Sequence, residues 1–297
     1  MKVILLGTAA GGGYPQWNCA CAMCARVGEN CPPRSQDCVA VSADGGNWLL
    51  LNASPDIRSQ IIGTPALAAG PGPRQTPIKA ALLTDAELDH TLGLLMLREA
   101  AAGLRVFAPG AALRALRSGL PIQGITGAYG GWDWRIAGSG FETEGLRVRV
   151  LPVGDKRPKY ARELDIEGPW VVAYRIEDPA TGGVLVYAPC LATWPDGFDE
   201  FVTGASYALI DGTFYSPDEM AGATASGVSQ GAQRRMGHIP MAGDDGSLGR
   251  LRRHPGVRWA YTHLNNTNPA LDTTSAAYAE VRAAGADIPV DGTELTL

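Results

Sequence analysis

The chain has 297 residues, with 25 Lys and Arg against 30 Asp and Glu, and a net charge of −5 at pH 7. This acidic balance, without a Lys/Arg patch, argues against a nucleic-acid partner. Every apolar run is far shorter than the ~20 residues that cross a bilayer, which argues against a membrane protein. With 45% apolar residues, the chain can bury a sizeable core as one large domain or two small ones.

The N-terminal residues predict a strand rather than a signal peptide. The apolar run Val3–Leu6 is too short for a signal peptide, and no small-residue cleavage site follows it. We therefore expect a cytoplasmic protein. Disulfides are rare in that compartment, where clustered cysteines more often bind a metal.

Short β-branched and leucine-rich runs with turn residues at their ends predict strands. In chain order these are Lys2–Leu6, Val39–Ser42, Trp48–Asn52, Lys79–Leu83, Leu104–Phe107, Leu146–Leu151, Val171–Ile176, Val184–Tyr187, Ala208–Ile210 and Arg258–Tyr261. The predicted helices are Asp56–Ile62, Thr91–Ala102, Pro109–Ser118 and Thr274–Ala284. The strands gather in two groups, which favours two packed sheets with helices outside. Residues 122–140 and 222–249 are predicted to be long loops of the kind that act as lids.

Three cysteines lie close together, Cys19, Cys21 and Cys24, in the pattern C-x-C-x2-C. Three thiolates can converge on one ion, and tetrahedral thiolate sites favour Zn²⁺, so we predict a structural zinc there. The cluster lacks a fourth ligand, which Cys31, Cys38 or a distant His or Asn could supply. Buried free thiols and a redox pair are the alternatives.

A second cluster follows the predicted strand Lys79–Leu83. Asp85, Glu87, Asp89 and His90 stand within six residues at the carboxyl end of that strand. Mixed carboxylate and imidazole ligands suit Zn²⁺, Fe²⁺ or Mn²⁺, so this cluster is a candidate metal site. The alternative is a helix N-terminus, where acidic side chains are favoured by the helix dipole.

The segment TDAELDH at 84–90 resembles the T-H-x-H-x-D-H metal motif of the metallo-β-lactamase superfamily, with carboxylates in place of both leading histidines. Later motifs follow the order of that fold: Asp211 in IDGTF, His238 in MGHIP and His263 in YTH. With the cysteine cluster, the set resembles the coenzyme PQQ synthesis protein B family over essentially the whole chain. The resemblance implies a single α/β domain over 1–297, a four-layer αββα sandwich of two mixed sheets flanked by helices.

The departures from the superfamily pattern matter as much as the match. Hydrolases of the superfamily hold two zinc ions through four or five histidines and a bridging aspartate, whereas this chain has four histidines in all. Pro189 stands at the position of the bridging aspartate. A two-zinc hydrolase is therefore disfavoured. Two histidines and one carboxylate with open positions form instead the ligand set of non-haem Fe(II) oxygenases.

The resemblance implies a role in the biosynthesis of pyrroloquinoline quinone (PQQ). It implies hydroxylation, with Fe²⁺ and O2, of the tyrosine ring of a Glu-Tyr-derived precursor; the alternative is a carrier that transports PQQ or its precursor without catalysis. The expected partners are this small, peptide-derived precursor and O2, and a homodimer is left open. Neither a nucleic acid nor a membrane is expected as a partner.

The same resemblance implies roles for single residues. Asp89, His90 and His263 are the expected iron ligands, and Asp85 or Asp211 would act as a further ligand or as a supporting base. His238 would contact substrate or an open metal position. Beside the resemblance, the residues themselves suggest that Arg234 and Arg235 bind a substrate carboxylate or form a solvated pair. His254, which lies beyond a glycine-rich loop, is expected at the surface.

Overall fold

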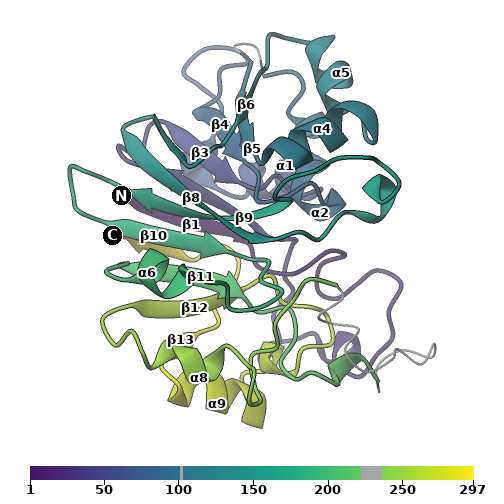
Figure 1. Ribbon diagram of the computed structural model, residues 1–297, viewed down its shortest axis with the longest axis vertical. Helices are drawn as coiled ribbons and strands as arrows, with labels where there is room; N and C mark the ends of the chain where they lie inside the picture. The colour runs from purple at the N-terminus through teal and green to yellow at the C-terminus, as the bar shows by residue number, and fades with distance from the viewer. Residues whose placement is uncertain (101–102, 222–235) are drawn as a thin grey trace.

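The computed structural model describes residues 1–100, 103–221 and 236–297. Within these residues the chain forms two mixed seven-stranded sheets with helices on their outer faces, as the sequence predicted. Figure 1 shows α4 and α5 beside β5 and β6 at the top of the view, and α8 and α9 beside β12 and β13 at the bottom. The predicted four-layer arrangement is confirmed.

The first sheet has the strand order β14-β1-β2-β3-β4-β5-β6. Its strands are β1 (Lys2–Gly7), β2 (Cys38–Ser42), β3 (Trp48–Leu51), β4 (Ile78–Leu82), β5 (Arg105–Ala108), β6 (Asp133–Ile136) and β14 (Glu294–Thr296). Neighbouring strands from β3 to β6 pair in parallel. Their carboxyl ends therefore lie at one edge of the sheet, where loops can gather side chains.

The second sheet has the order β13-β12-β11-β10-β9-β8-β7. Its strands are β7 (Gly140–Thr143), β8 (Leu146–Gly154), β9 (Val171–Glu177), β10 (Val184–Ala188), β11 (Tyr207–Asp211), β12 (Arg258–Thr262) and β13 (Ala286–Asp287). Strands β10 to β13 also pair in parallel, so this sheet too presents several carboxyl ends at one edge.

The helices are short. Among the described residues the α-helices are α1 (Ile57–Ile62), α2 (Leu88–Thr91), α3 (Gly93–Met96), α4 (Gly110–Ser118), α5 (Ile122–Gly127), α6 (Phe198–Val202), α8 (Leu248–Leu251) and α9 (Ala276–Ala283). The 3₁₀ turns are η1 (Cys24–Arg26), η2 (Pro65–Leu67), η3 (Lys159–Ala161), η4 (Glu219–Ala221) and η5 (Pro269–Leu271). In the described part of the chain, no helix has the length and apolar character that a membrane crossing requires.

The core has a layer between the sheets and layers beneath the helices. One cluster joins inward-facing residues of both sheets, among them Leu5, Leu82 and Leu209, which are fully buried. Residues at alternate positions of the same strands, such as Ala81 and Ile210, belong to the second cluster, which includes helix residues. Strands buried on both faces read as continuous apolar runs, which is why these central strands were predictable.

The prediction of a loop over 122–140 is wrong. Residues Ile122–Gly127 form α5, and Asp133–Ile136 form β6, which pairs in parallel with β5. Because β6 lies at the edge of its sheet, its side chains are largely exposed and lack apolar alternation. The pattern of a half-buried strand is therefore missing from the sequence. Part of the other predicted loop, 222–249, lies outside the described residues, and Arg234 and Arg235 belong to that part.

The prediction of one helix over Thr91–Ala102 is also wrong. The chain forms α2, which begins at Leu88 and includes Asp89 and His90, and then α3 from Gly93. The Gly93 N–H donates to Ala53 O at 2.9 Å, outside the helix, and a Cβ there would meet Ser54 O at 2.2 Å. This close approach to the loop after β3 divides the helix. The other three predicted helices are present as α1, α4 and α9.

Candidate metal centre

The candidate residues gather where the carboxyl ends of parallel strands from both sheets meet. Asp85, Asp89 and His90 follow β4, while Asp211 ends β11 and His263 follows β12. A cavity of about 610 Å³ opens at this edge and is lined by Asp89, His90 and His263 together with His238. The two sheets thus contribute opposite walls of one site.

His90 is hydrogen-bonded at one ring nitrogen, and within the described residues it makes no hydrogen bond at the other. Its Nδ1 lies 2.8 Å from both carboxylate oxygens of Asp85, which also accepts the Glu87 N–H. Burial by itself raises the pKa of Asp85, but the charge of His90 and these hydrogen bonds outweigh it and lower the pKa to about 2. The Nε2 of His90 is buried and has no hydrogen-bond partner among the described residues. A buried nitrogen of this kind is the atom that a metal ion would satisfy.

His263 is aimed at the same point by an unusual backbone conformation. Its φ of 58° lies in the left-handed region, which few residues other than glycine adopt. The next residue holds this turn, because the Leu264 N–H donates to Thr8 O at 2.9 Å. His263 Nδ1 lies 2.9 Å from Thr213 Oγ1, and His263 Nε2 lies 3.3 Å from Asp89 Oδ2. Backbone strain at a ligand-type histidine is typical of a functional site.

Asp89 lies between the two histidines. Its Oδ2 is 3.3 Å from His263 Nε2 and 3.8 Å from His90 Nε2, and the two imidazole centroids are 5.1 Å apart. Burial raises the pKa of Asp89, but the neighbouring imidazoles outweigh it and hold the pKa well below its usual range. The structure thus brings together the two histidines and the carboxylate that the sequence grouped as metal ligands.

Asp211 and His238 form a second pair beside this set. Asp211 Oδ2 accepts from His238 Nδ1 at 2.7 Å and from the Leu191 N–H at 2.8 Å. Its Oδ1 accepts from the backbone N–H and hydroxyl of Thr213 at 3.0 and 2.7 Å. Both oxygens are therefore engaged in positioning neighbours. The His238 ring stacks 5.2 Å from that of His263, and burial lowers the pKa of His238.

The cysteine cluster forms a second candidate metal site. The Sγ atoms of Cys19, Cys21 and Cys24 lie within 4.8 Å of one another. The side-chain amide of Asn266 faces them, with Nδ2 at 3.3, 3.7 and 3.3 Å from the three sulfurs. Rotation of the amide by 180° would place its oxygen there instead. Asn266 is thus a candidate fourth ligand, a distant Asn of the kind the sequence left open.

Some residues of the site were not found from the sequence. The turn after β10 presents Cys190 to the cavity. Cys190 follows Pro189, which stands where hydrolases of the superfamily have their bridging aspartate. Thr213 contacts both His238 and His263. A strand end followed by a cysteine is a weak signal, and nothing local distinguishes Thr213 from any other turn residue.

One wall of the cavity is basic. It is made by residues 156–162, here called the basic segment, which follow β8 and include η3. Lys156 Nζ lies 3.0 Å from Glu87 Oε1, so this cation is paired, and both residues line the cavity. The cavity is also lined by Arg157, Lys159 and Arg162. Lys159 and Arg162 are exposed, and within the described residues neither has a salt-bridge partner.

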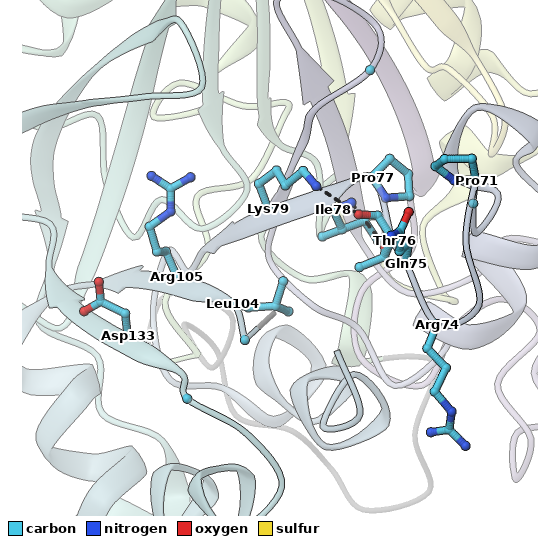
Figure 2. Close-up of a pocket in the computed structure, with 14 residues that line it drawn as sticks. Pro71, Arg74, Gln75, Thr76, Pro77, Ile78, Lys79, Leu104, Arg105 and Asp133 are labelled. Carbon is cyan, nitrogen blue, oxygen red and sulfur yellow. Dashed lines mark hydrogen bonds between the residues drawn. The ribbon is translucent and has the colours of Figure 1, made fainter. Parts of the chain in front are cut away.

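A larger cavity, of about 950 Å³, lies at the amino ends of β4, β5 and β6, opposite the histidines. Its cations are already engaged: Lys79 donates to Thr76 O at 3.1 Å, Arg74 pairs with Glu99, and Arg105 pairs with Glu144. Figure 2 shows the two arginines pointing away from one another. Their charges therefore do not converge on a ligand, and the cavity lacks the chemistry of the histidine site.

The fourth histidine lies outside the cavity. His254 Nε2 is 2.8 Å from Asp199 Oδ1, and its side chain is only 11% exposed. The residue expected at the surface is therefore half-buried beside a partly exposed aspartate. His254 remains separate from the candidate metal centre, and it is a useful control for variants of the other three.

Comparisons with known proteins agree with this architecture. A family model described as a beta-lactamase superfamily domain matches residues 47–263. The chain is 39% identical over 308 residues to the coenzyme PQQ synthesis protein B of Methylococcus capsulatus, with 100% of both chains covered. It is 36% identical to the Zn²⁺-bound PqqB of Methylobacterium extorquens, with a TM-score of 0.90 and 100% of both chains covered. A diphosphatase of the PhnP family, 20% identical, shares the fold with a TM-score of 0.70 over 99% of this chain and 96% of that one.

Proposed function

The chain belongs to the coenzyme PQQ synthesis protein B family of the metallo-β-lactamase superfamily, and from this premise we propose that it is an iron-dependent hydroxylase in PQQ synthesis. The observation that carries the proposal is the convergence of His90 Nε2, His263 Nε2 and Asp89 Oδ2 on one point at the cavity wall. Two imidazoles and one carboxylate are the ligands of non-haem Fe(II) oxygenases.

The substrate is a Glu-Tyr-derived precursor, and O2 is the oxidant. One oxygen atom enters the tyrosine ring as a hydroxyl, while the other leaves as water with two electrons from an added reductant and two protons. Fe²⁺ held by His90, His263 and Asp89 would supply the activation of O2 and a Lewis-acidic site for the substrate oxygens. The remaining work belongs to side chains of this chain.

Substrate binding falls to the basic segment. The precursor carries carboxylates, and Lys159 and Arg162 are exposed cations at the mouth of the cavity. Arginine recognises carboxylates through two parallel hydrogen bonds, whereas lysine acts as a point charge. The tyrosine ring would then lie near His90 and His263, which line the same cavity as the basic segment. This polarity orients the substrate with its ring toward the metal ligands and its carboxylates toward solvent.

Proton transfer falls to His238. Because Asp211 engages its Nδ1 at 2.7 Å, the other ring nitrogen is the one available to the cavity, which His238 lines. Burial lowers the pKa of His238, so the imidazole is neutral and can accept a proton at physiological pH. A carboxylate behind a neutral imidazole fixes the tautomer and stabilises the charged ring that forms.

The test is turnover with isotopically labelled oxygen. Fe(II)-loaded protein, a Glu-Tyr dipeptide, ascorbate and ¹⁸O2 should give a product that carries one ¹⁸O atom in the tyrosine ring, detected by mass spectrometry. His90→Ala should abolish the product, and the matched variant His254→Ala should not, because His254 lies outside the cavity.

Two results would contradict the hydroxylase. One is the absence of labelled product from metal-loaded wild-type protein, and the other is equal product from His90→Ala. Tight binding of PQQ or of the precursor that is unchanged in His90→Ala and occurs without turnover would instead favour the carrier function.

A further inference from the structure

The turn after β10 carries a thiol that the proposed reaction does not use. Cys190 is 8% exposed and lines the same cavity as His90 and His263. The backbone around it is fixed, because the Leu191 N–H donates to Asp211 Oδ2 at 2.8 Å and Leu191 O accepts the Ile239 N–H. The backbone beside the thiol is therefore held by Asp211 at the end of β11 and by the loop that carries His238.

The position of this thiol is that of a ligand. The sulfur of Cys190 and one ring nitrogen each of His90 and His263 all lie within 4.8 Å of one another. Zinc binds thiolate at about 2.3 Å and imidazole at about 2.0–2.1 Å, so small side-chain rotations would let the three atoms share one ion. The buried Nε2 of His90, which makes no hydrogen bond in the part of the chain that the structure describes, points independently to an ion at this place.

Core packing alone explains the position of the Cys190 thiol less well than metal ligation does. Cys38 is another buried cysteine, and its Sγ donates to Asn52 O at 3.3 Å, as a packed thiol usually does. In the described part of the chain, Cys190 Sγ has no such acceptor. Cys190 belongs to the apolar core cluster together with Leu191, but unlike Cys38 it also lines the cavity that His90 and His263 line. Packing accounts for the buried side chain of Cys190 but not for the approach of its sulfur to both histidines.

We propose that Cys190 is a thiolate ligand of the metal held by His90, His263 and Asp89. The inference rests on the metal site of the proposed function but not on the reaction. A thiolate adds a negative charge to that of Asp89, so the pair would neutralise a divalent ion. It also makes the site softer than two histidines and one carboxylate, which favours Zn²⁺ and Co²⁺ over Mg²⁺ or Mn²⁺.

The test uses Co²⁺ as a spectroscopic probe. The full-length protein, with zinc retained at the cysteine cluster and verified by elemental analysis, is titrated with Co²⁺ under anaerobic conditions. One equivalent should develop a near-ultraviolet thiolate-to-cobalt charge-transfer band. Cys190→Ser should lose this band and bind Co²⁺ at least about tenfold more weakly, since the loss even of an outer partner of a ligand costs that much. Cys38→Ser is the matched control and should retain the band.

A second variant separates ligation from folding. Cys190→Asp replaces the thiolate by a carboxylate and should bind one equivalent of Co²⁺ without the charge-transfer band. A band that persists in Cys190→Ser or Cys190→Asp would overturn the inference, as would wild-type protein that binds Co²⁺ without the band. If His90→Ala binds as much Co²⁺ as wild type, the metal site of the proposed function fails together with the thiolate ligand. If the charge-transfer band depends on Cys190 but the metal-loaded protein forms no hydroxylated product, the ligand assignment stands and only the proposed reaction is rejected.

Discussion

Each imidazole of the candidate metal centre is held at Nδ1 by a different side chain. Asp85 holds His90, Thr213 holds His263, and Asp211 holds His238. Holding one nitrogen fixes the tautomer and the ring plane, so the other nitrogen is presented to the cavity without a further loss of rotamer freedom. A carboxylate also raises the basicity of its histidine, which a hydroxyl does far less.

Asp85→Asn should weaken metal binding at the histidine site by about 10–100-fold, because the charged partner of His90 is lost while its shape is kept. Affinity is measured by competition with a chromogenic chelator. Asp199→Asn removes the corresponding partner of His254, outside the cavity, and should leave affinity unchanged. Equal affinity in Asp85→Asn and wild type would show that Asp85 does not support the metal.

Arg162→Ala should raise the KM for a carboxylate-bearing precursor by about two- to fivefold with little change in kcat. The side chain is exposed, so solvent screening limits its contribution to about 1 kcal/mol. The effect should shrink at high salt because the attraction is electrostatic. Arg147→Ala, an exposed arginine at the start of β8 outside the cavity, is the control. A lower kcat with unchanged KM would contradict substrate binding by the basic segment.

Glu219 gives a prediction of pH-dependent stability. Burial raises its pKa to about 7, although Thr267 and the Tyr215 N–H oppose the shift. Between about pH 4.3, where an unfolded glutamate titrates, and pH 7, the folded chain binds more protons than the unfolded chain. The free energy of unfolding should therefore fall as pH rises through this window, by at most about 4 kcal/mol before solvent screening. Urea unfolding at pH 5 and pH 8 checks this. In Glu219→Gln the free energy of unfolding should depend less on pH than in wild type. An equal pH dependence in the two proteins would show that Glu219 does not contribute to it.

At the residue scale, spacing predicted the candidate ligands that stand in one short segment, and the family resemblance added Asp211, His238 and His263 from distant segments. Neither signal predicted Cys190 or Thr213. Asp85, Asp89 and His90 follow one buried strand, so their spacing alone indicated a site. Cys190 and Thr213 reach the same cavity through the pairing of β10, β11 and β12. That proximity depends on strand register, which a single sequence does not specify.

At the scale of elements, the cysteine cluster joins two loops that are far apart in the chain. Its thiols come from the loop after β1, and Asn266 comes from the loop after β12, next to His263. Arg26 and Asp272 add an ion pair at 3.0 Å between the same two loops. A metal ion here would therefore hold the His263 turn in place as well as the cysteines.

Cys21→Ser should reduce the zinc content by about one atom per chain and lower the thermal midpoint, because structural zinc contributes folding free energy. Asn266→Ala should weaken zinc retention against a chelator if the amide oxygen is the fourth ligand. Elemental analysis and thermal unfolding measure both. Cys31→Ser, which changes a buried thiol outside the cluster, should retain the zinc. Unchanged zinc content in Cys21→Ser would show that the ligands are misplaced.

Among elements, burial decided what could be predicted. Central strands such as β3, β10 and β11 are buried along their whole length or nearly so and read as apolar runs. The edge strands β6, β7 and β14 are short and more exposed, and the sequence gives them no periodic pattern. Helix α2 was predicted to begin three residues late, because its first turn contains Asp89, which belongs to the acidic cluster that was read as a loop.

At the scale of the whole molecule, a buried polar network joins the two sheets beneath the metal centre. Asp37, which precedes β2, accepts from the hydroxyl of Tyr187 on β10. The Asn52 amide donates to the same hydroxyl at 3.0 Å, and its oxygen accepts from the Thr84 N–H at 2.9 Å. Thr84 in turn donates to Asp85 at 2.8 Å. Buried networks of this kind fix a unique arrangement when every member has a partner.

Tyr187→Phe should therefore destabilise the fold and loosen the site together. Losing the hydroxyl leaves a buried acceptor of Asp37 without its donor, at a cost of about 1–3 kcal/mol in the free energy of unfolding. Tyr207→Phe is the matched control: this tyrosine is buried in the same layer between the sheets, and its hydroxyl has no hydrogen bond within the described residues. Urea unfolding should separate the two variants by at least about 1 kcal/mol. Metal affinity should fall only in Tyr187→Phe, because the network ends at the carboxylate that holds His90. Equal effects of the two variants would show that the sheets are joined by apolar packing alone.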